Sequence, residues 1–467
     1  MTLRIRPARD SPISRAFKGD GQPDNRLTPV DHALFVGQLA TDWKPVMQVV
    51  WVYQHPVDFD GLRRFQYNLG HGLLGRRIER SPLPFARSRW VLDRGPSDID
   101  IAGSARPRSE VSDWADERTQ LTIDPESGPG WHLGVLPLTD GSTAVSLVIS
   151  HHVADGLGLV SALLDAVNDN ERDLGYPPPR SLTRLRAVVQ DSGQTARDVP
   201  AAARALVAAA RQARRDRQDG AHPRAARPGA VTGSDGDHHV VIPAVTINVG
   251  LDDWDARAEA LGGTSRTLVA ALVAKFAEHI GRRRASDGTV TLRMPISTRT
   301  DGDSRANAVS YMPVSFDPKG LTTDLTQLRK TISQALKALR ETPDESLELA
   351  SLTPFIPRRV LKRMNNAIVV DPDMPVFCSN LGDFGSVVCR LDGTDAEYVT
   401  GRLTTQGDTR KRLEQIGGMM TVQSWRLPDH IVINIGAYQP GAENTKPALR
   451  ELATRTLAEF GLEGQVE

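Results

Sequence analysis

Hydrophobic and polar residues alternate in several short runs along the chain, and each alternation predicts a half-buried β-strand. The clearest run extends from Thr143 to Ile149, and an apolar segment from Leu157 to Val167 that predicts a helix follows it after a short polar turn. Further strands are predicted at 47–53, 131–138, 239–242, 245–249, 289–294, 414–422 and 431–435.

Helical spacing is clearest in the second half of the chain. Leu268, Leu272, Phe276 and Ile280 lie four residues apart, so they share one face of a helix that Thr264 or Ser265 would cap. Other helices are predicted after Pro29 and over 60–74, where Asp60 is a suitable cap. Strands and helices therefore mix along the chain, which predicts an α/β (α+β) fold.

The length of 467 residues exceeds that of one ordinary domain. We expect an N-terminal domain over 1–180, a crossover linker over 181–238 and a C-terminal domain over 239–467. The linker holds an Ala/Arg stretch at 201–217 that is helical by propensity, and residues 216–238 have a composition typical of mobile segments. Because 201–217 lacks a strong apolar stripe, we expect a solvated connecting helix. Contact with an anionic membrane or a carrier protein is the alternative.

Composition narrows the possible functions. Lys plus Arg (57) balances Asp plus Glu (57), so the chain has no electrostatic footprint for nucleic acid. The two cysteines, Cys378 and Cys389, cannot form a zinc site alone, although a disulfide between them stays possible. The first residues lack a secretory signal and nothing reaches about 20 apolar residues, so we expect a cytoplasmic protein. Motifs for a serine hydrolase, a nucleotide, a redox cofactor or a metalloprotease are missing from the sequence.

The turn after the strand at 143–149 carries the candidate chemistry. It has the sequence Ser-His-His-Val-Ala-Asp-Gly from Ser150 to Gly156. A histidine fixed at the end of a strand can act as a general base, because its ordinary pKa of about 6.5 leaves much of it neutral in the cell. His152 points to the opposite face of the strand from His151, which disfavours a shared metal and favours a structural role for His152. The N–H of Gly156, at the start of the next helix, can stabilise an oxyanion.

This turn resembles the His-x-x-x-Asp-Gly motif of the thioester-dependent acyltransferases. That superfamily includes chloramphenicol acetyltransferase, peptide-synthetase condensation domains, the plant BAHD enzymes and the bacterial wax ester synthase/diacylglycerol acyltransferases. The motif assigns the catalytic position to His151, and Ser150 stands where many relatives have another histidine. Three further blocks match the wax ester synthase type in order and spacing: 27–35, 295–299 followed by Asn307, and 378–382.

The resemblance implies two chloramphenicol-acetyltransferase-like domains in a V arrangement, with His151 in an interdomain channel and a bridging loop near 371–410. It also implies that Asp155 is structural and pairs with an arginine, for which Arg299 is a candidate, although the residues alone also allow a Ser-His-Asp type of partner. Ser379, Asn380 and Thr298 are candidates to line the channel. Gly70, Gly72 and Gly75 either shape it or loosen the helix before them.

The function that the resemblance implies is direct transfer of an acyl group from a thioester to a hydroxyl or amine, without an acyl-enzyme. The co-substrate would be acyl-CoA or a phosphopantetheinyl carrier protein, with no bound cofactor or metal. We expect a small-molecule acceptor and a monomer. A peripheral-membrane wax ester or triacylglycerol synthase and a non-catalytic condensation-like binding protein are the alternatives.

Overall fold

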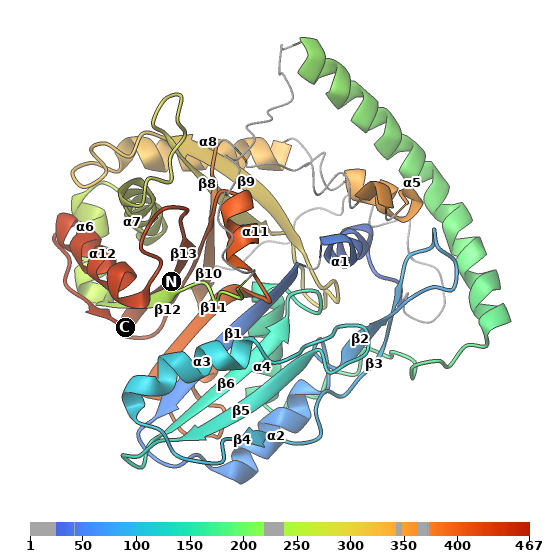
Figure 1. Cartoon of the computed structure of the whole chain (residues 1–467), viewed down its shortest axis with the longest axis horizontal. Helices are drawn as coiled ribbons and strands as arrows, with labels where there is room; N and C mark the ends of the chain where they lie inside the picture. The colour runs from blue at the N-terminus through green and yellow to red at the C-terminus, as the bar shows by residue number, and fades with distance from the viewer. Residues whose placement is uncertain are drawn as a thin grey trace.

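The computed structural model describes residues 25–41, 43–218, 238–341, 348–357, 359–361, 371 and 373–467. These residues form two large mixed sheets, a small hairpin and the helices that cover them (Figure 1). The α/β fold class predicted from the sequence is therefore confirmed. The part of the linker at 219–237 that we predicted to be mobile lies outside the described residues.

The first sheet has five strands in the order β11-β1-β6-β5-β4. Their bounds are β1 (Lys44–Tyr53), β4 (Asp100–Ile101), β5 (Trp131–Pro137), β6 (Thr143–Ser150) and β11 (Tyr398–Gln406). The helices α2 (Phe59–Leu69) and α4 (Gly156–Val167) bury their apolar faces against one side of this sheet, and α3 (Val111–Thr119) packs on the other. Both faces are therefore covered, which explains why every residue of β6 is buried.

The second sheet has seven strands in the order β14-β7-β13-β12-β10-β8-β9. Their bounds are β7 (Ala244–Gly250), β8 (Val290–Ser297), β9 (Val309–Phe316), β10 (Val376–Asp383), β12 (Met419–Arg426), β13 (His430–Tyr438) and β14 (Gln465–Val466). Its core is formed with α6 (Leu251–Ala260), α7 (Ser265–His279), α8 (Thr326–Glu341) and α12 (Lys446–Glu459). Thr264 caps α7 as predicted, within a full capping box.

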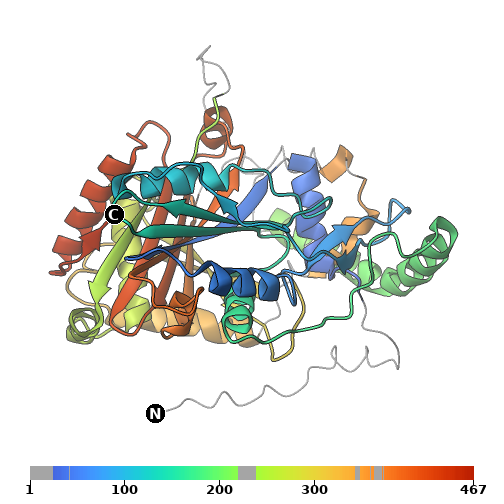
Figure 2. The ribbon, with the colours of Figure 1, turned by 90° about the horizontal axis from the view of Figure 1, so that it is seen from below.

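The remaining elements connect and extend these layers. The hairpin of β2 (Arg76–Glu79) and β3 (Arg89–Leu92) lies beside α1 (Pro29–Thr41) and the long helix α5 (Arg184–Gln218) (Figure 1). Short segments complete the chain: η2 (Arg108–Glu110), η3 (Ala350–Phe355), η4 (Val387–Cys389) and α11 (Arg410–Gln415). In Figure 2, which views the molecule at right angles, α5 again lies at one end of it.

Two strand predictions were wrong. Residues 240–243 form no strand, and His239 makes only an isolated bridge to Thr409. The predicted strand at 414–422 contains the end of α11 and a double-glycine turn at Gly417 and Gly418, both with positive φ, so the strand begins only at Met419. Sequence alternation is a weak guide where a glycine pair interrupts it.

The strand β11 connects the two parts of the chain. It comes from the predicted C-terminal domain, yet it pairs with β1 along nine residues of the first sheet. The predicted bridging loop at 371–410 therefore contains one strand of each sheet, β10 and β11. The division at residues 180 and 238 and the V arrangement stay predictions.

Candidate active site

His151 lies immediately after β6, at the start of the turn that leads into α4. Its backbone N–H donates to the carbonyl of Pro45 at 3.0 Å, and its carbonyl accepts a hydrogen bond from the Asn307 side chain at 3.4 Å. The N–H of Val153 donates to the carbonyl of Ser150 at 3.0 Å, which closes the turn. The side chain of His151 is thus fixed at its base and half-buried, and it lies on the wall of a cavity.

Asp155 holds the start of α4 and the second sheet together. One carboxylate oxygen, Oδ1, accepts the Gly158 N–H at 2.7 Å and caps α4. The other, Oδ2, accepts the Ala308 N–H at 2.8 Å and lies 2.9 Å from Nη2 of Arg299. Asp155 therefore pairs with an arginine, as the resemblance implied, and that arginine is the candidate Arg299. Both carboxylate oxygens have partners other than the imidazole of His151.

A second buried carboxylate explains the block at 27–35. Asp31, on α1, accepts hydrogen bonds from the backbone N–H groups of Ala306 and Asn307 at 3.2 and 2.8 Å, and from the Asn307 side chain at 3.2 Å. Asp31 thus binds Ala306 and Asn307, and Asp155 binds the next residue, Ala308. The two carboxylates hold one short segment in place. Three blocks far apart in the sequence meet beside His151.

Arg76, which no sequence pattern indicated, braces the other side of the turn. Its buried guanidinium donates to the carbonyls of Val153 and Ser304 and to the hydroxyl of Tyr176, and it stacks over Trp90 at 4.1 Å. An arginine at the start of a short strand carries no local signal for such a role, because its partners come from distant segments.

The three glycines before Arg76 form the turn that leads from α2 into β2. A Cβ at Gly75 would lie 2.3 Å from the carbonyl oxygen of Gly70, so the chain can fold back here only without a side chain. Gly70, Gly72 and Gly75 are not among the residues that line the cavity in the described structure. They position Arg76.

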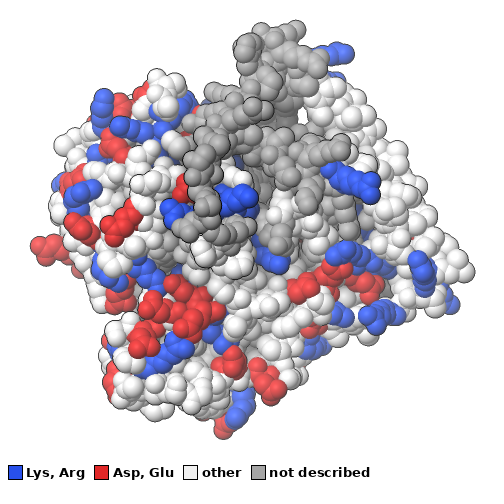
Figure 3. All heavy atoms as spheres, in the orientation of Figure 1, with Lys and Arg blue, Asp and Glu red and all other residues white. Residues whose placement is uncertain are grey.

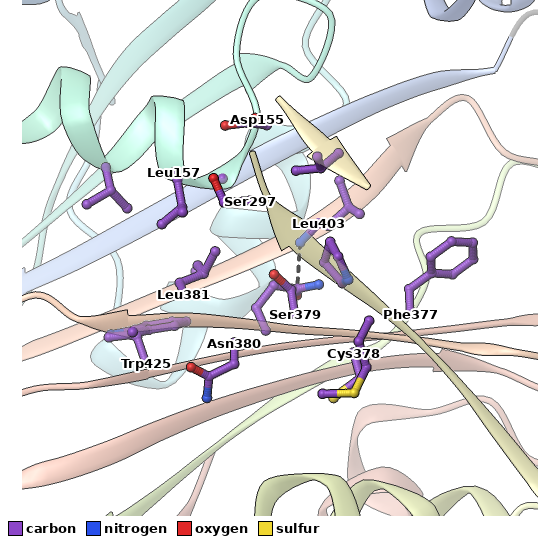
Figure 4. Close-up of a pocket in the computed structure, with 18 of the residues that line it drawn as sticks. Asp155, Leu157, Ser297, Phe377, Cys378, Ser379, Asn380, Leu381, Leu403 and Trp425 are labelled. Carbon is purple, nitrogen blue, oxygen red and sulfur yellow. Dashed lines mark hydrogen bonds between the residues drawn. The ribbon is translucent and has the colours of Figure 1, made fainter. Parts of the chain in front are cut away.

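The cavity beside His151 has a volume of about 590 Å³, within the range of small-molecule sites. Its walls come from both sheets and from α4, α7 and α8, and most of them are apolar. Figure 4 shows Leu157, Leu381 and Trp425 at one end of the labelled side chains and Phe377 and Cys378 at the other. The strand β10 thus runs along the cavity from Phe377 and Cys378 at one end to Leu381 at the other, where it approaches α4.

The structure distributes the predicted channel residues unevenly. Ser379 and Asn380 line the cavity, and the Asn380 side chain donates to the hydroxyl of Ser424 at 3.2 Å. Thr298 is exposed and is not part of the cavity wall, which its neighbour Ser297 joins instead. Gly156 lines the cavity at the start of α4.

Burial sets the protonation of both histidines in the turn. It lowers the pKa of His151, and the nearby Asp155 carboxylate offsets part of this effect. The ring of His151 is therefore neutral at pH 7 and can accept a proton. Burial, with a smaller contribution from His151, lowers the pKa of His152 to about 3. His152 is buried and neither of its ring nitrogens has a hydrogen-bond partner among the described residues, so its ring contributes as packing.

The described residues contain no cluster of three or more histidine, cysteine or acidic side chains that could hold a metal ion. Cys378 and Cys389 are both free and buried, and burial raises the pKa of the Cys378 thiol to about 12. Across the described residues, every helix is too short or too polar to span a bilayer.

Comparison with known proteins supports the predicted resemblance. No protein-family model matches the chain. Over 166 residues the chain is 31% identical to a candidate diacylglycerol O-acyltransferase of Mycobacterium tuberculosis (strain H37Rv). This match covers 34% of the chain and 33% of that relative, so the chain spans about a third of the length of the relative.

The chain also matches solved structures over almost its whole length, and two of them illustrate the match. The first condensation domain of the calcium-dependent antibiotic synthetase, in complex with a substrate analogue, has a TM-score of 0.54 and 15% identity over 95% of this chain and 100% of that one. The wax ester synthase/diacylglycerol acyltransferase of Marinobacter aquaeolei VT8 has a TM-score of 0.53 and 16% identity over 94% and 100%. The resemblance predicted from the four sequence blocks is confirmed: the chain has the fold of condensation domains and of wax ester synthase/diacylglycerol acyltransferase.

Proposed function

We propose that the protein is an acyltransferase that moves an acyl group from a thioester to a hydroxyl or amine, with His151 as the general base. The observation that carries this proposal is the position of His151 on the wall of a largely apolar cavity. The neighbouring carboxylate of Asp155 is fully used by backbone N–H groups and Arg299, so it serves the geometry of the turn. The imidazole remains the group in the turn that can exchange a proton with a substrate.

The chemistry needs one base. The acceptor O–H or N–H gives its proton to the imidazole of His151 while the acceptor atom attacks the thioester carbonyl. The tetrahedral intermediate then expels the thiolate, which takes the proton back from the imidazolium. Because both substrates are held in one cavity, proximity lowers the barrier as well.

Gly156 is suited to stabilise the oxyanion of that intermediate. It is the first residue of α4, so its N–H belongs to the unpaired donors at a positively polarised helix end. A Cβ there would lie 2.8 Å from Cδ2 of Leu381 on β10. Glycine therefore lets α4 approach β10 closely at the point where the carbonyl would lie.

The donor in this proposal is an acyl-CoA or an acyl group on a phosphopantetheinyl carrier protein, used as a co-substrate. Condensation domains and a wax ester synthase/diacylglycerol acyltransferase share the fold, which supports a thioester donor. No bound cofactor or metal takes part in the proposed reaction.

A lipid-like acceptor is the second candidate. The relative in Mycobacterium tuberculosis is named for diacylglycerol, and the largely apolar cavity wall includes Phe384 and Trp425, whose ring centroids stack 6.3 Å apart. Both observations favour a long apolar acceptor over a polar small molecule. The experiment below therefore also tests for wax ester or triacylglycerol synthase activity.

The deciding experiment measures free thiol release from acyl-CoAs of different chain length, with polar alcohols, long-chain alcohols and diacylglycerol as acceptors. We expect release that depends on an acceptor, with the ester as product. His151→Ala should lower the rate by about 10²–10⁴-fold. His71→Ala is the matched control, because that histidine is not among the residues that line the cavity and its Nδ1 contacts the Tyr67 carbonyl of the preceding helix α2. Equal rates for the wild type and His151→Ala would refute the assignment of His151 as the base. If no combination of donor and acceptor releases thiol, the proposed activity is refuted and the non-catalytic binding protein becomes the better explanation.

A further inference from the structure

The long helix α5 presents an apolar face to solvent. Five of its aliphatic side chains are exposed: Leu185 (74%), Val189 (65%), Val199 (51%), Leu206 (62%) and Val207 (49%). With 3.6 residues per turn, these positions fall within about 100° of one another around the helix. They form one stripe that is about 33 Å long at 1.5 Å per residue. We call this set of five the α5 stripe.

A row of arginines runs along one edge of the α5 stripe. Arg186, Arg197, Arg204 and Arg211 follow one another at intervals of about two or three helical turns, so they share a line roughly 100° from the centre of the stripe. All four are exposed. In Figure 3 the right-hand edge of the molecule, where α5 runs in Figure 1, is mostly white with separate blue groups.

The two acidic side chains of α5 that the structure describes face away from the arginine row. Asp191 is fully buried and binds Arg89 through both oxygens at 2.7 and 2.8 Å, with a further ion pair to Arg26. Asp198 binds Nε of Arg87 at 2.8 Å. These ion pairs fix which face of α5 points outward. Among the side chains of α5 that the structure describes, the solvent side carries aliphatic and basic groups without an acid.

We infer that α5 is a docking surface for an anionic lipid bilayer. An amphipathic helix binds a membrane by burying its apolar face among the acyl chains and placing its cations at the phosphates, and α5 offers both along one edge. The arginine row requires a negatively charged occupant. This charge disfavours a second copy of the chain, in which one arginine row would meet another.

A protein partner fits less well than a bilayer. Protein interfaces gain most of their affinity from aromatic and arginine anchors seated in pockets. The sequence of α5 contains no aromatic residue, and its exposed aliphatic groups are spread over about 33 Å with no concentrated anchor. A fluid surface accepts such a flat stripe without a matching pocket.

The test is co-sedimentation of the full chain with vesicles of phosphatidylcholine, or of equal parts phosphatidylcholine and phosphatidylglycerol. We expect sedimentation with the anionic vesicles that salt weakens, and at least about tenfold less with the neutral ones. Two variants separate the forces: V189E/L206E removes the apolar contact, and R197Q/R204Q/R211Q removes the charge. Each should lose tenfold or more of the binding while thiol release with a water-soluble acceptor persists.

Matched controls change equally exposed residues elsewhere. Tyr67→Glu alters a side chain that is 58% exposed on α2, and R64Q/R450Q/R455Q removes three exposed arginines outside α5. Both should bind vesicles like the wild type, and circular dichroism verifies that all variants fold. The inference is overturned if the wild type does not bind anionic vesicles, or if the controls lose as much binding as the α5 variants. It is also overturned if chromatography shows a dimer that only the α5 variants lose.

Discussion

Replacing Asp155 with asparagine separates a structural carboxylate from a catalytic one. The substitution keeps the size of the side chain but removes the charge that faces Arg299 at 2.9 Å. In the wild type the Ala308 N–H donates to the carboxylate at 2.8 Å. In the variant it faces an amide, in which an NH₂ group replaces one of the two acceptor oxygens. The cap of α4 survives, because asparagine is as good at that position as aspartate.

The expected cost follows from burial. The Asp155 and Arg299 side chains are 3% and 12% exposed, so the pair is buried, and removing one partner of such a pair costs about 3–5 kcal/mol. A typical domain has only about 5–15 kcal/mol of stability, so Asp155→Asn should lower it markedly. Asp165→Asn is the control: its carboxylate is 30% exposed and lies 3.9 Å from Arg172, so the loss should stay below about 1 kcal/mol.

Urea unfolding, followed by tryptophan fluorescence, measures both variants against the wild type, and thiol release is measured on the fraction that remains folded. We expect Asp155→Asn to unfold at clearly lower urea, with its residual activity limited by the folding of the turn. Unchanged stability with about 10⁴-fold lower kcat is the pattern of a Ser-His-Asp partner. That result would refute the structural role of Asp155.

Three further predictions concern the same region. Burial lowers the pKa of His132 to about 4 and of His152 to about 3, so the folded protein binds fewer protons than the unfolded chain. The free energy of unfolding should therefore be highest above about pH 6.5 and fall as the pH drops towards 4. In urea titrations, His152→Phe should make the free energy of unfolding less dependent on pH. Because the pKa of His151 is lowered, kcat/KM should fall only on the acid side, with an apparent pKa below 6.5; a fall above pH 7 would contradict the neutral base. Gly156→Ala keeps the backbone N–H but places a Cβ 2.8 Å from Cδ2 of Leu381, so it should fold with a shifted Leu381 side chain and lose tenfold or more of its activity if catalysis needs α4 this close to β10. An unchanged kcat in Gly156→Ala would show that this close approach is not needed.

Local sequence patterns predicted the elements around the site well. The alternation up to Ile149, the polar turn and the apolar run from Leu157 correspond to β6, the His151 turn and α4. The hydrogen bonds and side-chain spacing of such elements depend on residues that are close in sequence. A strand that is buried on both faces, such as β6, accepts few residues other than apolar or small ones. The resemblance implied that Asp155 pairs with an arginine, but it left the choice of arginine open, with Arg299 as one candidate.

Contacts between distant segments escaped prediction. Arg76 braces the turn through partners up to 228 residues away, which no local pattern encodes. The α5 stripe was missed for a related reason. The sequence stretch at 201–217 lacks a strong apolar stripe, but the helix begins at Arg184, and Leu185 and Val189 extend the face that Leu206 and Val207 continue.

The pairing of β11 with β1 also constrains how the polypeptide can be made and divided. The partners Lys44 and Gln406 are more than 350 residues apart, so this ladder forms only after most of the chain has left the ribosome. Until then β1 has an open edge that invites pairing with other chains. A fragment ending near residue 180 would keep that edge permanently, and we expect it to aggregate. Adding a synthetic peptide spanning 398–406 should restore solubility, as a missing strand does in split proteins.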